Sequence, residues 1–275
     1  MKEYYLPLGM SVGFCKKDFS QRLKDAAEAG FQYIDFDISG YWSNPKEQAK
    51  YYAKMEEGLE DVKRAGLKIN AVHLAFGTPW DPSDKWEFRR KKVVKKLVSA
   101  IKKTEGGDPF CYVLHASFEP ISNKKREKRI QSLLRSLPEI CAATKSLICI
   151  EVLPRTCLFN TAKESLEILK RAGIENLKIC LDTNHFLQEK TEEGVLALGD
   201  NVKTLHVSDH DYKNERHWMP GKGSIDWNAV LGALEKTGYS GVFNYEVDNV
   251  SASEVKENYK MLFDGYNAAK NNGKE

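Results

Sequence analysis

The sequence lacks the features that would tie it to a membrane or a polyanion. Its 275 residues contain no run of about 18 apolar residues, the length that a membrane-spanning helix needs. The first residues lack the apolar core of a signal peptide, so we expect a cytoplasmic protein without membrane association. Lys and Arg number 42 against 39 Asp and Glu. This net charge of +3 is too small to imply a polyanionic partner, and we expect no nucleic-acid partner.

Two cofactor signatures are also missing. The six cysteines include no Cys-x-x-Cys pair, which argues against a zinc knuckle and a thioredoxin-type redox site. Cys111, Cys149 and Cys180 lie inside short apolar runs, where a reduced thiol packs as a small hydrophobic side chain. No Gly-x-Gly-x-x-Gly follows the first strand-like run, which argues against dinucleotide binding.

What the sequence does contain is a regular alternation of strand-like and helical segments. Eight short apolar runs predict parallel strands covered by helices: Leu8–Phe14, Tyr33–Ile38, Ile69–Leu74, Tyr112–Ala116, Leu147–Val152, Leu177–Leu181, Lys203–Ser208 and Val242–Val247. Helical patterns follow them: Phe19–Ala29, Glu47–Ala65, Asp84–Lys103, Lys125–Thr144, Ala162–Ala172, Gly194–Leu198, Asn228–Lys236 and Ser253–Lys270. The alternation predicts a single-domain (β/α)8 TIM barrel over residues 1–270, with a polar tail at 271–275. A doubly wound sheet is the alternative.

Ionisable side chains gather at one end of these strands. Six runs carry them at or beside their C-terminal ends: His73, His115, Glu151, Asp182, His206 and Glu246. In a TIM barrel these ends build the active site. Carboxylates that converge there repel each other unless a cation lies among them, so four residues are predicted to bind a metal: Glu151, Asp182, His206 and Glu246. A mixed carboxylate and imidazole set suits Mn, Mg, Co or Zn. The competing interpretation is a salt-bridge network with Arg155 and Lys203.

Four further histidines are candidates for the same site. His185 lies three residues after Asp182, where it can bind either the metal or a substrate hydroxyl. His73 and His115 occupy parallel positions on adjacent strands, which favours a shared role at the site as much as two places in the core. His217 lies in the long segment after the seventh strand and faces the predicted site.

Three motifs resemble one known superfamily. They are Leu181–His185 (LDTNH), Leu205–Asp209 (LHVSD) and Pro220–Trp227 (PGKGSIDW). Together they are similar to the xylose isomerase-like barrel superfamily, and the similarity extends over nearly the whole chain. That superfamily holds sugar and sugar-phosphate isomerases and epimerases, and also endonuclease IV.

The resemblance implies roles for individual side chains. In the sugar 3-epimerase members one divalent ion, often manganese, is held by four residues that match Glu151, Asp182, His206 and Glu246. The same resemblance implies that Glu151 and Glu246 form an acid/base pair. It implies a substrate-binding role for His185 and, through a looser match, for Arg216. We expect His73, His115 and His217 to contribute to substrate binding as well.

These observations predict a sugar or sugar-phosphate isomerase or epimerase that depends on one divalent ion (Mn, Zn, Co or Mg). The ion would polarise a carbonyl and stabilise an enediolate while one glutamate removes a proton and the other returns it. The expected partner is a small carbohydrate, and homo-oligomerisation stays open. The alternative is a zinc-dependent phosphodiesterase like endonuclease IV, acting on abasic DNA with the further ligands His73, His115, His185 and His217. Its Asp-Arg-His motif stands here as Glu215-Arg216-His217.

Overall fold

The computed structural model describes residues 2–14, 16, 18–39, 45–118 and 120–272. Within them eight strands alternate with eight α-helices. The strands are β1 (Leu8–Gly13), β2 (Tyr33–Asp37), β3 (Lys68–His73), β4 (Cys111–Leu114), β5 (Leu147–Glu151), β6 (Leu177–Asp182), β7 (Val202–His206) and β8 (Phe243–Tyr245). The helices are α1 (Phe19–Glu28), α2 (Pro45–Arg64), α3 (Glu87–Thr104), α4 (Asn123–Cys141), α5 (Ala162–Ala172), α6 (Thr191–Leu198), α7 (Trp227–Thr237) and α8 (Ala252–Asn272).

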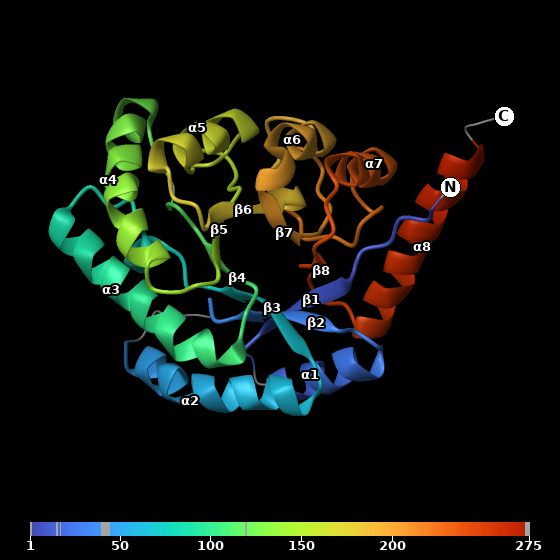
Figure 1. Ribbon diagram of the computed structural model, residues 1–275, viewed down its shortest axis with the longest axis horizontal. Helices are drawn as coiled ribbons and strands as arrows, with labels where there is room; N and C mark the ends of the chain where they lie inside the picture. Colours follow the sequence, from blue (N-terminus) through green and yellow to red (C-terminus); the bar gives the residue numbers. More distant parts are fainter. Residues whose placement is uncertain (1, 15, 17, 40–44, 119, 273–275) are drawn as a thin grey trace.

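The strands form one parallel sheet in the order β7-β6-β5-β4-β3-β2-β1-β8. Its two outer strands meet just past their ends, where Val207 and Tyr245 form a parallel bridge. There the Glu246 amide donates to the Val207 carbonyl at 3.0 Å. The sheet thereby closes on itself with the helices around it (Figure 1). This is the predicted single-domain (β/α)8 TIM barrel, and it places the C-terminal ends of all strands around one mouth.

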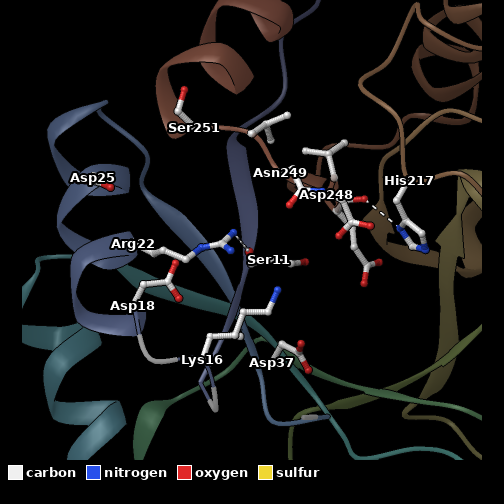
Figure 2. A pocket seen from close by; sticks show the side chains of 14 residues that line it. Ser11, Lys16, Asp18, Arg22, Asp25, Asp37, His217, Asp248, Asn249 and Ser251 are labelled. Atoms are coloured by element: carbon white, nitrogen blue, oxygen red, sulfur yellow. Dashed lines mark hydrogen bonds between the residues drawn. The ribbon is translucent and has the colours of Figure 1, made fainter. Parts of the chain in front are cut away.

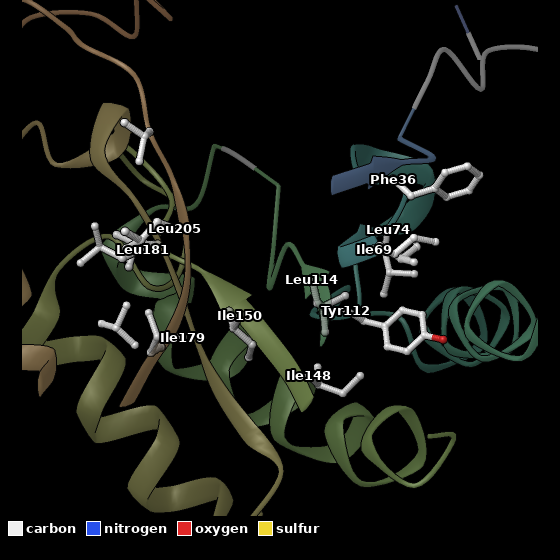
Figure 3. Packing of buried hydrophobic residues seen from close by; sticks show 14 of the residues in the cluster. Phe36, Ile69, Leu74, Tyr112, Leu114, Ile148, Ile150, Ile179, Leu181 and Leu205 are labelled. Atoms are coloured by element: carbon white, nitrogen blue, oxygen red, sulfur yellow. The ribbon is translucent and has the colours of Figure 1, made fainter. Parts of the chain in front are cut away.

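The barrel has two apolar regions that differ in side-chain size. Large side chains on the outer faces of the strands pack beneath the helices, as Phe36, Leu114 and Leu181 do in Figure 3. A second cluster of small buried side chains fills the barrel interior: Ala71, Cys111, Val113, Cys149 and Cys180. Cys111, Cys141, Cys149 and Cys180 are free and buried, as expected of reduced thiols. Cys157 is also buried, and Cys15 lies outside the described residues.

Several elements begin or end at other residues than predicted, and three of them bear on the sequence prediction most directly. Strand β8 is short and stops at Tyr245, so Glu246 follows the strand instead of lying within it. Helix α6 begins at Thr191, three residues earlier than expected. Helix α8 continues to Asn272, where the Lys270 ammonium pairs with Glu235 of α7, so residues 271–272 of the expected tail are helical. Residues 273–275 lie outside the described residues. Within the described chain, no helix is both long and apolar enough to span a bilayer.

Candidate metal centre and active site

A cavity of about 270 Å³ opens at the C-terminal ends of the strands. Seven of the residues predicted from the sequence line it: His73, His115, Glu151, Asp182, His185, His217 and Glu246. His206 is fully buried beside it, with its Nδ1 atom 2.9 Å from Glu246 Oε2. The barrel therefore brings residues at or directly after the ends of six strands, and two further residues from loops, to one site, as the strand-end pattern predicts.

Glu151 lies at the centre of the histidines. Its Oε2 atom is 2.9 Å from His115 Nε2 and 3.1 Å from His73 Nε2, and its Oε1 atom is 3.2 Å from His185 Nδ1. The side chain is 2% exposed. Burial by itself would raise the pKa of this carboxyl, but the neighbouring imidazoles of His115 and His206 hold it well below the usual value. Glu151 is therefore ionised at neutral pH although water hardly reaches it.

Three donor atoms converge from the next three strands. One oxygen each of Asp182 and Glu246 and a nitrogen of His206 lie within 4.8 Å of one another. Asp182 Oδ2, His206 Nδ1 and Glu246 Oε2 are all buried and make no hydrogen bond of good geometry, although His206 Nδ1 lies 2.9 Å from Glu246 Oε2 and His185 Nδ1 lies 3.0 Å from Asp182 Oδ2. Unpartnered buried polar atoms are costly and rare in folded proteins, and here three atoms of metal-binding type share the same small volume. Glu151 Oε2 adds a fourth donor 3.7 Å from His206 Nδ1. These atoms fit a divalent cation.

The pKa values of the two outer carboxyls of this set shift in opposite directions. Burial, with the neighbouring charges of Glu151 and Glu246, raises the pKa of Asp182 to about 7. For Glu246 the effect of burial is outweighed by the positive charge of His206, which lowers its pKa to about 2. A cation among these groups would favour the ionised form of both.

Local backbone turns aim the side chains that follow β6. A short 3-10 helix, Thr183–His185, begins at Asp182, whose Oδ1 atom accepts from the Asn184 amide at 2.7 Å. This contact leaves Oδ2 of Asp182 for the cluster. His185 Nδ1 lies 2.8 Å from the Val152 carbonyl, to which it donates. Its Nε2 atom consequently turns toward the cavity wall, 3.9 Å from Glu215.

The Pro220–Trp227 motif fixes the long segment between β7 and α7. The buried Asp209 carboxylate accepts hydrogen bonds from the Gly221 amide at 2.8 Å, the Ile225 amide at 3.2 Å and Trp227 Nε1 at 2.9 Å. Gly223 packs so closely that an added Cβ would lie 2.2 Å from Asp209 Oδ1. The motif is thus a clamp on Asp209, and the segment it holds carries His217 to the cavity.

Arg216 is the one predicted site residue that the structure does not bring to the cavity. Its guanidinium pairs with Asp211 at 2.8 Å and stacks over Trp218, 5.3 Å from the ring centre. Arg155 lines the cavity and pairs with Glu215 at 2.9 Å. Lys203, considered as a partner for the carboxylates, pairs with Asp200 instead. The alternative salt-bridge network therefore lacks its Lys203 contact.

Sequence reasoning missed two contributors. Phe76 lines the cavity and stacks on the His115 ring, with centroids 4.2 Å apart. Asp35, in the middle of β2, is fully buried with its Oδ2 atom 3.2 Å from His206 Nε2. The Asp35-Phe36-Asp37 triplet, two acidic residues inside an apolar run, is the signal that could have drawn attention to it.

A second cavity of about 580 Å³ adjoins the first and shares His217 and Glu246 with it. Figure 2 shows Lys16 and Arg22 on one side of it, and His217 and Asp248 on the other. Its wall is mostly polar, with hydroxyl, carboxylate and cationic groups that suit a polyhydroxy ligand. The site at the mouth thus continues into a larger space between β1 and the segment after β8.

Comparisons with known proteins agree with this architecture. The family model described as xylose isomerase-like TIM barrel matches residues 23–264, which confirms the resemblance seen in the sequence. D-psicose 3-epimerase of Ruminiclostridium cellulolyticum is 29% identical over 168 residues, covering 60% of this chain and 56% of the relative. L-ribulose 3-epimerase of Mesorhizobium japonicum is 24% identical over 257 residues, covering 90% and 81%. A solved D-tagatose 3-epimerase-like protein superposes with a TM-score of 0.78 at 25% identity, covering 95% of this chain and 99% of that one.

Proposed function

Because this chain belongs to the xylose isomerase-like TIM barrel family, we propose that it is a divalent-metal-dependent epimerase or isomerase of a small carbohydrate. The observation that carries the proposal is the convergence of Asp182 Oδ2, His206 Nδ1 and Glu246 Oε2, three buried atoms of metal-binding type that make no well-formed hydrogen bond. Together with Glu151 they would hold one ion. The similarity to ketose 3-epimerases supports a ketose as substrate and carbon 3 as the reacting centre.

When bound, a divalent ion supplies Lewis acidity: it polarises a substrate carbonyl and favours negative charge on its oxygen. The proton moves between the substrate carbon and two carboxylates of the chain. Glu246 has a side chain that is 29% exposed toward the two cavities and so reaches the substrate readily. Glu151 approaches from β5, with β6 and β7 between the two glutamates. One removes the proton beside the carbonyl and the other returns a proton from the other side.

Histidines of the cavity would position the substrate and the deeper glutamate. His185 is oriented by the Val152 carbonyl, which leaves its Nε2 atom to contact a substrate hydroxyl. His73 and His115 both contact Glu151 Oε2 and so hold that carboxylate in place. The cavity of about 270 Å³ lies just below the range of about 300–1,000 Å³ that is usual for ligand pockets, which suits a single sugar. The adjoining cavity leaves room for the rest of a longer substrate.

A ketose panel tests the proposal. Protein loaded with Mn²⁺ is incubated in deuterated water with ketopentoses, ketohexoses and their phosphates, and NMR follows deuterium at carbon and the appearance of an epimer or isomer. We expect exchange with at least one ketose, its loss after chelation and its return with metal. Exchange that is absent with every sugar, or that persists without metal, contradicts the proposal.

One observation favours a second candidate, a phosphodiesterase with more than one ion. His73, His115 and Glu151 form another group of donors within 4.8 Å. His73 Nδ1 lies 3.0 Å from the Leu74 carbonyl, which can only accept, so in a neutral ring the proton is on Nδ1. The lone pair of Nε2 then points at the Glu151 carboxylate. A proton or a second cation must lie between them. Elemental analysis distinguishes the candidates: one ion per chain favours the epimerase, whereas three ions and cleavage of abasic duplex DNA favour the phosphodiesterase.

A further inference from the structure

We propose that Asp35 is a positioning residue that fixes the tautomer of His206 and thereby aims its Nδ1 lone pair at the metal. The inference rests on the metal centre of the proposed function and deepens it. Asp35 lies in the middle of β2, away from the strand ends that supply the cavity residues. It touches no substrate space, so its effect must pass through His206.

The contact between the two side chains defines the orientation of the ring. Asp35 and His206 are both 0% exposed, and Asp35 Oδ2 lies 3.2 Å from His206 Nε2. A carboxylate only accepts hydrogen bonds, so the ring nitrogen facing it carries the proton. In a neutral imidazole the other nitrogen, Nδ1, then has a free lone pair. That atom lies 2.9 Å from Glu246 Oε2 and 3.7 Å from Glu151 Oε2, among the proposed ligands.

Asp35 is itself held by two donors on the opposite side of its carboxylate. Its Oδ1 atom accepts from Asn70 Nδ2 at 2.7 Å and from the Ala71 amide at 3.1 Å. Asn70 Nδ2 also donates to Thr204 Oγ1 at 2.9 Å, which links β3 to β7 across the barrel. These contacts fix which oxygen faces which neighbour, so Oδ2 stays directed at His206.

A β-bulge creates this arrangement. Strands β2 and β3 pair as Ile34 with Ile69 and then as Asp35 with Ala71, so Asn70 is an extra residue in β3. A bulge shifts the alternation of side chains along a strand, and bulges are frequent next to active sites. The extra residue places the Asn70 amide against Asp35 and restores an inward direction for His73 two residues after Ala71. The bulge thus positions both Asn70, which holds Asp35 behind the site, and His73, which lines the cavity.

A purely structural role does not account well for an acidic residue at position 35. A buried carboxylate costs stability unless it is paired, and apolar residues of similar volume often replace such pairs without loss. A hydrogen bond that a metal-binding histidine donates to a carboxylate, by contrast, orients the ring, and its removal typically lowers metal affinity by roughly 10–100-fold.

The test is Asp35→Asn, which keeps the shape and reverses one hydrogen bond. Asn70 and the Ala71 amide both donate to the δ1 position, so the oxygen of Asn must remain there and its NH₂ group must face His206 Nε2. The ring then accepts at Nε2 and carries its proton on Nδ1, where the ion would bind. The matched control is Thr204→Val, which removes a contact of the same network without touching His206.

Isothermal titration with Mn²⁺ measures the outcome. We expect a fall in affinity of roughly 10–100-fold for Asp35→Asn, and a Kd within about threefold of the unmodified protein for Thr204→Val, well short of the loss seen when a ligand-orienting contact is removed. A folded Asp35→Asn protein with unchanged Mn²⁺ affinity overturns the positioning role. If the unmodified protein binds no Mn²⁺ at all, the proposed metal centre fails instead.

A second measurement reads the tautomer without any substitution at Asp35. Nitrogen-15 histidine NMR of the unmodified metal-free protein, at a pH where the ring is neutral, distinguishes a protonated Nε2 from a protonated Nδ1. His206→Gln identifies the resonance. Protonation at Nε2 supports the proposal whether or not Asp35→Asn folds, and protonation at Nδ1 overturns it.

Discussion

Glu246→Gln should abolish most turnover without preventing substrate binding. The substitution keeps the side-chain volume but removes the negative charge and the ability to accept a proton from the substrate. General acid or base catalysis contributes roughly 10²–10⁴-fold, equivalent to about 2.7–5.5 kcal/mol of barrier. Glu246 Oε2 also lies 2.9 Å from His206 Nδ1 in the proposed metal set, so metal affinity should fall as well. The assay therefore needs saturating Mn²⁺, under which kcat should fall at least about 100-fold while KM changes little.

A matched substitution elsewhere separates this effect from the chemistry of the change itself. Glu127 lies on the exposed face of α4 and pairs with Arg171 at 2.7 Å. Glu127→Gln alters a surface ion pair, which is worth about 0–1 kcal/mol, and should leave kcat unchanged. Thermal unfolding of both variants checks that each is folded. Near-normal kcat for Glu246→Gln at saturating metal would refute the assignment of this carboxylate to proton transfer.

Four further outcomes are expected. Glu151→Gln should also lower kcat by at least about 100-fold. It should reduce Tm more than Glu246→Gln, because it leaves the buried His73 and the partly buried His115 facing an uncharged amide; an equal or smaller loss of Tm would contradict this. Chelation should lower Tm by roughly 5–10 °C, since an ion at 100 times its Kd contributes about 2.7 kcal/mol, and an unchanged scanning-calorimetry trace would count against a stabilising ion. The pKa of Asp182 is raised to about 7, which stabilises the metal-free fold at low pH, and this contribution disappears as the pH rises through that value. Because the ion binds the ionised carboxylate, Mn²⁺ affinity should increase from about pH 6 to about pH 8 in titrations. A decrease over this range would contradict the role of Asp182 as a ligand. Gly223→Ala should destabilise the fold by about 1–3 kcal/mol, because its Cβ meets the hydrogen-bonded Asp209 carboxylate. The control Gly265→Ala, in open space on α8, should be neutral or stabilising. Equal urea midpoints for the two variants would show that the Asp209 side chain moves aside.

The fold was predictable because its pattern is local. Apolar runs of strand length and amphipathic helical stretches recur eight times, and each follows from the period of its own secondary structure. Boundaries were less accurate where tertiary contacts decide them. Strand β8 keeps only three residues, because its pairing with β1 ends at Tyr245, the residue that also bridges to Val207 just after β7. The continuation of α8 to Asn272 depends on a contact between Lys270 and α7, which no local pattern reveals.

The site was predictable where a strand end alone determines position. Glu151, Asp182 and His206 end their strands, and parallel strands in a closed barrel end at one mouth. Asp35 could not be found in this way, because its role depends on a bulge and on a partner 171 residues away. The direction of Arg216 was equally hidden, since its amide donates to Asn184 far away in the sequence and its guanidinium pairs with Asp211.

Crystallography of the Mn²⁺-loaded protein tests most directly whether a divalent ion binds among Glu151, Asp182, His206 and Glu246. Anomalous scattering locates the ion independently of the protein density. The predicted result is one strong peak bonded to all four side chains at about 2.0–2.3 Å. A structure in which the four side chains point into different environments, or in which Mn²⁺ binds elsewhere and leaves this set empty, would contradict the proposed metal centre.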